Sequence, residues 1–240
     1  MKISAIIITY NEERNIKRCL ESLVKVVDEI VVVDSGSSDG TLEICKRYGV
    51  RIFLNPFINY SKQKNFALDK ASFEWVLSID ADEVLSNALI ERLNILKYKG
   101  FSADGYMIKR QNIAFGLVPK HFWEYQLRLF NKTKGKFVDL DVHEYVKVKG
   151  KVEHINEPII HYTYHTITEQ VIKLNKYSEM EAMQTKKKVS IFDLYLKPLY
   201  IFLVLLFKKG LIFDGIPGLH FAIMMAFYRY LVEFRIWLDS

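Results

Sequence analysis

Three carboxylates within four residues form a group that could bind a cation. An apolar run over 75–79, short enough to be one buried strand, leads directly into Asp80-Ala81-Asp82-Glu83. Neighbouring carboxylates repel one another and cost free energy to desolvate, so such a group at a strand end needs a cation to stabilise it. Proteins usually hold Mg²⁺ or Mn²⁺ with one or two carboxylates together with substrate phosphates. The alternative is a solvated acidic loop that caps the next helix.

The elements that must position this group are strands alternating with helices. Apolar, largely β-branched runs cover 3–9, 30–33, 50–54 and 75–79, with helical patterns between them. This alternation is typical of a parallel sheet covered on both faces, and ligands bind such sheets at the carboxyl ends of the strands. The first hundred residues therefore predict a Rossmann-like α/β half with the carboxylates at its ligand-binding edge.

Four helices are expected between and after these strands. In the first, Ile16, Cys19, Leu20 and Leu23 follow the helical spacing, with Asn11 as the N-cap. The other helices are predicted from about 39 to Gly49, over 60–71, and from Ser86 to about 99, where Gly100 ends the last one.

The first two predicted strands also end in polar loops. Residues 9–12 read Thr-Tyr-Asn-Glu, and 34–41 read Asp-Ser-Gly-Ser-Ser-Asp-Gly-Thr. These are neither a G-x-G-x-x-G dinucleotide fingerprint nor a P-loop. An acid such as Asp34 at a strand end can accept hydrogen bonds from ribose hydroxyls or a base N–H, and small residues after it let a ligand approach the backbone. A tight turn with Asp39 as a helix cap is an equally good interpretation.

Four segments, in this order and at matching spacing, resemble the motifs of family 2 glycosyltransferases with a GT-A fold. They are 9–12, 32–41, 63–65 and 79–82. Three shorter segments are similar to a narrower group, the bacterial lipopolysaccharide inner-core β-glucosyltransferases and their close relatives. These are 125–130, 142–144 and 213–219. The resemblance implies an α/β GT-A fold, with a mostly parallel central sheet, a small antiparallel part and C-terminal helices.

The resemblance also implies a role for each matching position. Asp82 would be the direct ligand of Mg²⁺ or Mn²⁺, and Asp80 would bind both ribose and the metal. Arg128 is open between a phosphate contact and an ion pair on the strand face, and His143 would face the diphosphate or the metal. Lys64 stands where many relatives carry arginine, and lysine supplies a point charge without a bidentate fork. The nucleotide-sugar pocket is expected to contain Thr9, Asn11, Glu12, Asp34, Lys64, Asp80, Arg128 and His143.

An inverting sugar transfer needs one general base to deprotonate the acceptor hydroxyl as it attacks the anomeric carbon. Glu124, within 123–126, resembles the position where inverting relatives place a catalytic carboxylate, although many of them have Asp there. Glu144, beside His143, is the alternative base. Each has a structural alternative: Glu124 as a surface residue beside a buried tryptophan, and His143 with Glu144 as a hydrogen-bonding pair.

In the middle of the chain the pattern changes to short strands that pair like antiparallel strands, and 132–135 predict a hairpin loop. The chain then turns helical, and Thr166 with Glu169 fits a capping box. We therefore expect a GT-A domain over 1–163 and a C-terminal helical, membrane-associating segment over 164–240.

Two apolar stretches of that segment, 191–207 and 216–232, contain charged residues. Both fall short of the roughly 20 clean apolar residues of a spanning helix. Because lysines at 186–188 and 208–209 flank the first stretch, both are expected to be interfacial helices resting on an anionic leaflet. An apolar face packed on the GT-A domain or on a partner subunit, and a hairpin entering the bilayer, are the alternatives.

Composition limits the other function classes. The chain has 34 Lys and Arg against 28 Asp and Glu, a net charge of +6. Zinc-finger spacing, an aromatic RNA-binding signature and a basic heptad region are all missing from the sequence, so nucleic acid is not an expected partner. Cys19 and Cys45 are expected to be reduced and buried, consistent with a cytosolic chain. The first apolar run is short and continues into the fold, which argues against a cleaved signal peptide.

These patterns and the resemblance together predict an inverting glycosyltransferase. It would transfer a hexose, glucose from UDP-glucose, to a lipopolysaccharide-core or other lipid-linked acceptor. It is expected in the cytoplasm, peripheral at the inner face of the cytoplasmic membrane. A nucleotidyltransferase is one alternative, although it usually has a glycine-rich basic loop that 9–12 do not supply. A non-catalytic, membrane-bound scaffold with a GT-like fold is the other.

Overall fold

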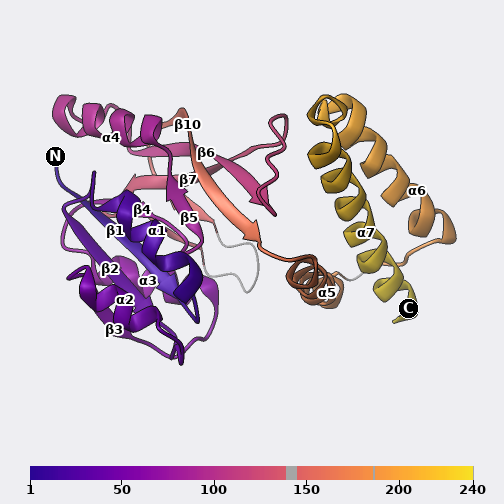
Figure 1. Ribbon diagram of the computed structural model, residues 1–240, viewed down its shortest axis with the longest axis horizontal. Coiled ribbons are helices and arrows are strands. Elements are labelled where there is room, and N and C mark those ends of the chain that lie inside the picture. Colours follow the sequence, from indigo (N-terminus) through magenta and orange to yellow (C-terminus); the bar gives the residue numbers. More distant parts are fainter. Residues whose placement is uncertain (139–144, 186, 240) are drawn as a thin grey trace. The chain divides into compact units, whose positions relative to one another are not determined.

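The computed structural model describes residues 1–138, 145–185 and 187–239 (Figure 1). The chain divides into two compact units, each built from two segments of sequence. The first unit comprises Met1–Arg110 and Glu124–His161, and the second comprises Gln111–Trp123 and Tyr162–Ser240.

The parallel half of the first unit forms as the apolar runs predict. Strand β1 (Ile3–Thr9) lies between β2 (Glu29–Asp34) and β4 (Trp75–Ser78), and β3 (Arg51–Leu54) is the edge strand beside β2. All three pairings are parallel, and Thr9 lies opposite Asp34 at the carboxyl ends of β1 and β2. The polar ends of these strands therefore meet at one edge of the sheet.

Helices cover both faces of this half, which explains why its strands are apolar almost throughout (Figure 1). Ile3 and Ile7 of β1 belong to one buried cluster, whereas Ile6 belongs to another, because successive strand residues face opposite sides. The first cluster includes residues of α1 (Glu13–Leu23), α2 (Thr41–Arg47) and α4 (Asn87–Lys99), and the second includes residues of α3 (Tyr60–Lys70).

Local signals place these helices correctly. Ser86 accepts a hydrogen bond from the Leu89 backbone at the start of α4, and Gly100, with φ 92°, follows its end. Gly49, with φ 63°, follows the last turn of α2 in the same way. Cys19 and Cys45 are buried free thiols, as expected.

The predicted N-cap of α1 is wrong. Glu12 occupies the N-cap position without a side-chain capping bond, and Asn11 has φ 55°. Asparagine tolerates this left-handed conformation better than most residues. Its Oδ1 accepts a hydrogen bond from the Ser38 backbone at 2.9 Å, so Asn11 joins the loop after β2 and does not cap its own helix.

The rest of the sheet is antiparallel. Strand β7 (Glu124–Asn131) lies between β4 and β6 (Gly105–Ala114), followed by β10 (Val152–Tyr164) and β5 (Glu83–Leu85). The full order is β3-β2-β1-β4-β7-β6-β10-β5, the predicted mixed sheet with a parallel and an antiparallel part.

The predicted hairpin at 132–135 is wrong in its pairing. Both edges of β7 are taken by β4 and β6, so β8 (Gly135–Phe137) cannot pair with it. Instead β8 forms a separate antiparallel pair with β9 (Val146–Val148). The segment is a turn, closed by the Lys134 N–H donating to the Asn131 carbonyl at 3.0 Å, but it joins strands of two different sheets.

The second unit is mainly helical. Its helices are α5 (Ile167–Gln184), α6 (Ile191–Leu203) and α7 (Ile216–Leu238), with a π-helical turn η1 (Val204–Lys208) and a 3₁₀ turn η2 (Leu211–Asp214) between the last two. Helix α7 packs against both α5 and α6. Within the described chain, none of the helices is both long enough and apolar enough to cross a membrane.

The capping box predicted at the start of α5 is half correct. Thr166 accepts a hydrogen bond from the Glu169 backbone at 3.1 Å. The Glu169 carboxylate returns to the backbone N–H of His165, at 2.9 Å, and not to that of Thr166. A complete capping box is found at α6, where Ser190 and Asp193 bond to each other's backbone N–H groups.

Candidate active site

Thr9 and Asp34 form the floor of the loops after β1 and β2. The Thr9 hydroxyl donates to Oδ2 of Asp34 at 2.8 Å, and the backbone N–H groups of Gly36 and Ser37 donate to Oδ1 at 2.9 and 2.8 Å. The Ser37 hydroxyl also donates to Oδ2. Asp34 is completely buried, and each of its two carboxylate oxygens accepts two hydrogen bonds. It therefore organises the loop after β2, on which a nucleotide would rest.

Asn11 and Glu12 join the two loops into one wall. The Asn11 N–H donates to the Ser37 hydroxyl, and the Glu12 N–H donates to the Thr41 hydroxyl, both at 2.8 Å. The Glu12 carboxylate accepts from the Asn15 amide at 2.7 Å. The structure thus brings together the predicted nucleotide-binding residues that follow β1 and β2.

Asp80 is held between two cations. Its Oδ1 lies 3.0 Å from Nζ of Lys64, which projects from α3, and its Oδ2 lies 2.9 Å from a guanidinium nitrogen of Arg128 on β7. Both cationic side chains are almost fully buried. Burial alone would raise the pKa of Asp80, but Arg128 and Lys64 outweigh it and hold that pKa well below its usual value. Asp80 is therefore ionised at neutral pH.

Glu83 is a buried junction that links this ion pair to a second arginine. Its Oε2 accepts from the Asp80 backbone N–H at 3.0 Å, and its Oε1 accepts from Arg128 at 2.6 Å and from Nε of Arg110 at 2.7 Å. Burial tends to lower the pKa of Arg110, but Glu83 and the neighbouring carboxylates raise it overall. Two arginines thus stabilise a carboxylate with no exposed surface.

Glu124, the candidate base, lies at the other end of Arg110. Nη1 of Arg110 donates to Oε1 of Glu124 at 2.6 Å, and the Gln126 amide donates to the same oxygen at 3.0 Å. The Glu124 side chain is 44% exposed. One carboxylate oxygen is therefore fixed by two donors while the group stays open to solvent, as a base that must receive an external hydroxyl requires.

Asp82 is paired with a histidine from a distant strand. Its Oδ2 lies 3.1 Å from Nε2 of His161 on β10, and both side chains are mostly buried. His161 reaches it because β10 pairs with β5, placing His161 opposite Glu83. The second acid of the Asp-x-Asp pattern therefore has a fixed orientation.

A buried thiol adjoins the same group. The Cys19 Sγ lies 3.7 Å from the Asp80 carbonyl oxygen. Burial, and then the negative charge of Glu83, Asp82 and Asp80, raise the pKa of Cys19 well above its ordinary value. Cys19 is consequently a neutral packing residue beneath the carboxylates.

Sequence reasoning missed two contributors, Arg110 and His161, and it included Glu83 only as the third acid of the carboxylate group. Three adjacent acids imply balancing cations, and an arginine within a predicted strand was a signal for Arg110. The pairing that brings His161 to Asp82 depends on residues 79 positions apart and left no local signal. Predicted residues His143 and Glu144 lie outside the described residues.

The donor set fits a hard divalent cation that arrives with phosphates. Asp80 and Asp82 supply carboxylate oxygens at the end of β4, the ligand type that Mg²⁺ and Mn²⁺ prefer. Over 1–138, 145–185 and 187–239, no group of three or more His, Cys, Asp or Glu side chains is arranged to hold a metal by itself.

Comparisons with known proteins agree with this geometry. The family model described as Glycosyl transferase family 2 matches residues 4–147. The chain is 34% identical over 250 residues to the lipopolysaccharide core biosynthesis glycosyltransferase LpsC of Rhizobium meliloti (strain 1021), covering 99% of this chain and 92% of that protein. It is 32% identical over 248 residues to the uncharacterized glycosyltransferase RC0292 of Rickettsia conorii, covering 96% and 88%.

Among solved structures, the S. aureus TarS fragment 1-349 matches with a TM-score of 0.50 at 16% identity, covering 97% of this chain and 90% of that chain. This likeness concerns the fold, and it identifies the mixed sheet with its following helices as the predicted GT-A architecture. The family model covers more than half of the chain, and the relatives align over nearly all of it. The chain belongs to glycosyl transferase family 2.

Proposed function

We propose that the chain transfers a hexose, glucose from UDP-glucose, with inversion to a lipopolysaccharide-core or other lipid-linked acceptor. The observation that carries this proposal is the continuous run of charged contacts from Lys64 and Asp80, through Arg128, Glu83 and Arg110, to Glu124. It connects a place for a diphosphate with a carboxylate suited to activate an acceptor.

In the proposed reaction, Glu124 accepts the proton of the acceptor hydroxyl as its oxygen attacks the anomeric carbon. The attack comes from the face opposite the diphosphate, so the new glycosidic bond forms as the bond to the diphosphate breaks, and UDP leaves with the electron pair. Glu144 is the alternative base. Arg110 and Gln126 fix the Glu124 carboxylate in one orientation before the acceptor arrives.

Lys64 and Arg128 would offset the negative charge of the donor. Both contact Asp80, one on each oxygen, and both lie beside the acids that would hold the metal. A bound Mg²⁺ or Mn²⁺ supplies further neutralisation of the departing diphosphate, and Asp82 with Asp80 would hold it. Because Arg128 already pairs with Asp80 and Glu83, we propose that Arg128 and Lys64 act on the diphosphate as neighbouring positive charges, with His143 as a further proposed contact.

The nucleoside part of the donor would lie against the loops after β1 and β2. Thr9, Asn11, Glu12 and Asp34 form that wall, and the mutual bonding of the loops reduces the ordering cost of binding. Because Asp34 is buried and both of its oxygens are already bonded, we propose that it serves the uracil or ribose site through the backbone of the loop that it organises.

The acceptor proposal draws on the similarity to LpsC, a lipopolysaccharide core biosynthesis glycosyltransferase that aligns along 92% of its own length. If the acceptor is lipid-linked, the sugar transfer takes place at a membrane surface. We therefore propose peripheral association with the inner face of the cytoplasmic membrane, with the GT-A domain over 1–163 catalytic and the segment over 164–240 associating with the membrane.

The experiment is a product assay on purified protein with UDP-sugars, Mn²⁺ and lipopolysaccharide-core acceptors of increasing length. We expect UDP as the released nucleotide and a new β-linked hexose on one acceptor. Release of pyrophosphate from a nucleoside triphosphate and a sugar phosphate would instead identify a nucleotidyltransferase. A folded protein without turnover of any donor would favour the scaffold.

A further inference from the structure

The outer side of α6 is apolar along its length. Exposed residues follow at successive turns, namely Phe192, Leu196, Leu199, Tyr200 and Leu203, and each exposes between 43% and 71% of its surface. Their spacing is helical, so they form one stripe. A helix that faces water normally presents polar residues on this side.

One charged residue of α6 approaches a buried acid of α7. Asp193 and Lys197 pair at 2.8 Å, and Lys197 also lies 3.7 Å from Glu233 of α7. The Glu233 side chain is 1% exposed, and Lys187 and Arg229 add contacts to it at 2.8 and 3.7 Å. The buried Glu233 carboxylate is thus surrounded by three cations, while the apolar side chains of the α6 stripe are exposed, which is unusual for a helix in water.

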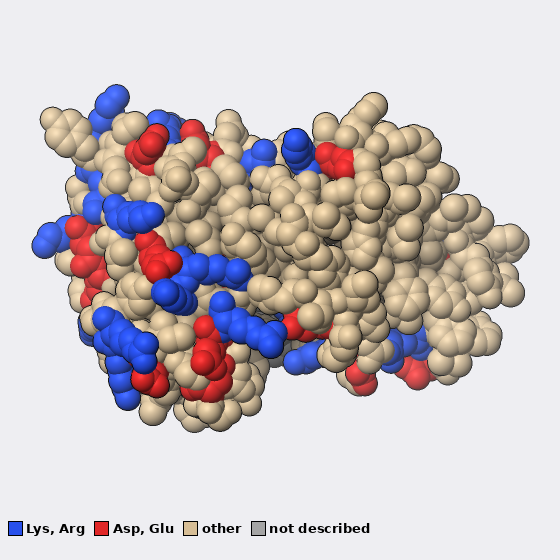
Figure 2. Space-filling view, in the orientation of Figure 1, with Lys and Arg blue, Asp and Glu red and all other residues tan. Residues whose placement is uncertain are grey.

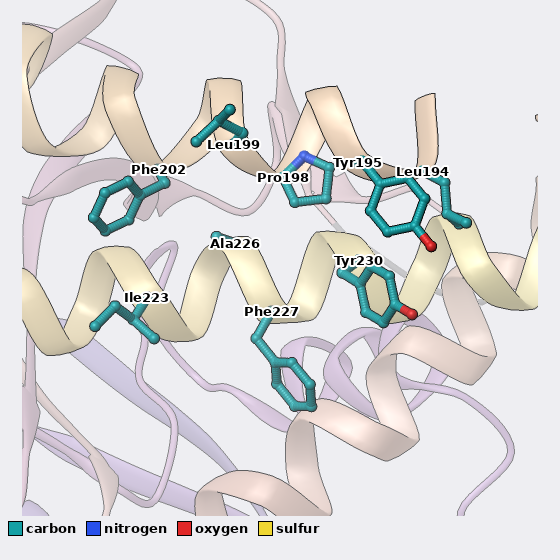
Figure 3. Close-up of a pocket in the computed structure, with 9 residues that line it drawn as sticks. All are labelled: Leu194, Tyr195, Pro198, Leu199, Phe202, Ile223, Ala226, Phe227 and Tyr230. Carbon is teal, nitrogen blue, oxygen red and sulfur yellow. The ribbon is translucent and has the colours of Figure 1, made fainter. Parts of the chain in front are cut away.

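Helix α7 continues the apolar surface. Ile216, Leu219, Ile223 and Phe227 recur every three or four residues and are exposed. A groove of about 350 Å³ lies between the two helices, and its lining includes Leu199 of α6 and Ile223 and Phe227 of α7 (Figure 3). We call the two stripes and this groove the α6–α7 face, over which few charged atoms are seen (Figure 2).

Cations and aromatic side chains border this face. Lys188 precedes α6, and Lys208 and Lys209 end η1, all three exposed. Tyr200 and Trp237 are also exposed, at 66% and 46%. Lysines attract anionic lipid headgroups, and tyrosine and tryptophan favour the boundary between headgroups and acyl chains. A bilayer offers both partners in adjacent layers.

We propose that the α6–α7 face docks onto an anionic lipid bilayer, with its stripes in the headgroup–acyl boundary and its lysines among the headgroups. Helix α6 has 13 residues, and at 1.5 Å rise it is about 20 Å long, less than the roughly 30 Å of a hydrocarbon core. Helix α7, with 23 residues, is longer, but among the described residues no helix is both long enough and apolar enough to cross a membrane. We therefore place both helices along the surface. This inference names the surface for the membrane association in the proposed function, but bilayer binding involves no sugar transfer and is tested separately.

The test is co-sedimentation of the full chain with vesicles of phosphatidylcholine alone or with 30% phosphatidylglycerol. We expect binding to the anionic vesicles and binding at least tenfold weaker for the double variant Leu196→Gln with Leu199→Gln, because two exposed contacts with the acyl region are lost. Ile95→Gln is the matched control, since Ile95 is also exposed but lies on α4, and it should bind like the parent chain. Lys208→Gln with Lys209→Gln should weaken binding roughly tenfold on anionic vesicles.

Two results would overturn the proposal. One is failure of the folded parent chain to sediment with anionic vesicles, and the other is equal binding by the Leu196→Gln/Leu199→Gln variant. Analytical ultracentrifugation tests the remaining possibility, that the face binds a second copy of the chain. A parent chain that forms a dimer but does not bind vesicles, with the Leu196→Gln/Leu199→Gln variant monomeric, would assign the face to that second copy. Because none of these measurements contains donor or acceptor, a negative result leaves the proposed glycosyl transfer standing.

Discussion

The guanidinium of Arg110 contacts Glu124 and Glu83 at once, with Nη1 2.6 Å from Oε1 of Glu124 and Nε 2.7 Å from Oε1 of Glu83. Glu83 is completely buried, whereas Glu124 is partly open to solvent. The candidate base is therefore anchored to the interior beneath the Asp-x-Asp segment.

Replacing the base tests its chemical role. Glu124→Gln keeps the shape of the side chain but removes its capacity to accept a proton, so kcat should fall by roughly 10²–10⁴. UDP affinity should change little, because Glu124 lies at the acceptor end of the charged contacts. Steady-state kinetics and calorimetry on the same preparation measure both quantities. Glu144→Gln is the matched comparison, and a larger loss in that variant would transfer the role to Glu144.

Arg110 is predicted to act as a positioning residue. Arg110→Met should lower kcat by roughly 10²-fold, because displacement of a reacting group by about 1 Å costs that much, while KM for the donor stays near the parent value. Arg110→Lys can reach one carboxylate but not both in a fork, so it should recover part of kcat. Two results would contradict the positioning role: a parental kcat in Arg110→Met, or a folded Arg110→Lys variant whose kcat is no higher than that of Arg110→Met.

The motif at 213–219 is predicted to be structural. Gly218 lies in the first turn of α7, where an added Cβ would sit 1.9 Å from the Leu211 carbonyl oxygen. Asp214 in the same segment accepts from both the backbone and the ring nitrogen of His121, at 2.9 and 2.7 Å. Gly218→Ala should therefore lower the free energy of unfolding by about 1–3 kcal/mol through overpacking. Denaturant unfolding measures this, and Leu219→Ala on the exposed side should have a smaller effect.

Glu29 should make the free energy of unfolding depend on pH in the acid range. Burial raises its pKa, but hydrogen bonds from Ser4, Ser72 and Arg51 outweigh burial and lower the pKa to about 2 from an ordinary value of 4.5. Since the folded-state pKa is depressed, the stabilisation is complete above pH 4.5 and is lost as pH falls toward 2. Unfolding free energies measured across this range should fall less steeply for Glu29→Gln. An unchanged slope would contradict the assignment, and Glu43→Gln at an exposed ion pair is the control.

The sequence predicted the parts of the fold that depend on local pattern. The strands ending at Thr9 and Asp34 and the helix capped by Ser86 follow from short apolar runs and capping residues. Parallel pairing then brings the polar strand ends to one edge, so the neighbourhood of Asp80 and Asp82 could be anticipated. The order of these elements, together with the shared family motifs, was sufficient to predict the GT-A fold.

The remaining contacts of the site depend on pairing between distant strands, which local sequence pattern does not predict. His161 meets Asp82, 79 positions away, because β10 pairs with β5, and Arg110 meets Glu83 across 27 positions. The turn after Asn131 looked like a hairpin because its residues suit a turn, but the edges of β7 were already occupied. In each case the deciding factor was the pairing of strands that are distant in the sequence.

The most direct test of the central claim is calorimetric titration of the protein with UDP, with and without Mn²⁺. The proposed function predicts that Mn²⁺ strengthens UDP binding and that Asp82→Asn removes this gain while leaving the fold intact. Asp69→Asn, at an exposed carboxylate on α3, should keep the gain. Absence of UDP binding by the folded parent chain under both conditions, or a full Mn²⁺ effect in Asp82→Asn, would contradict the account.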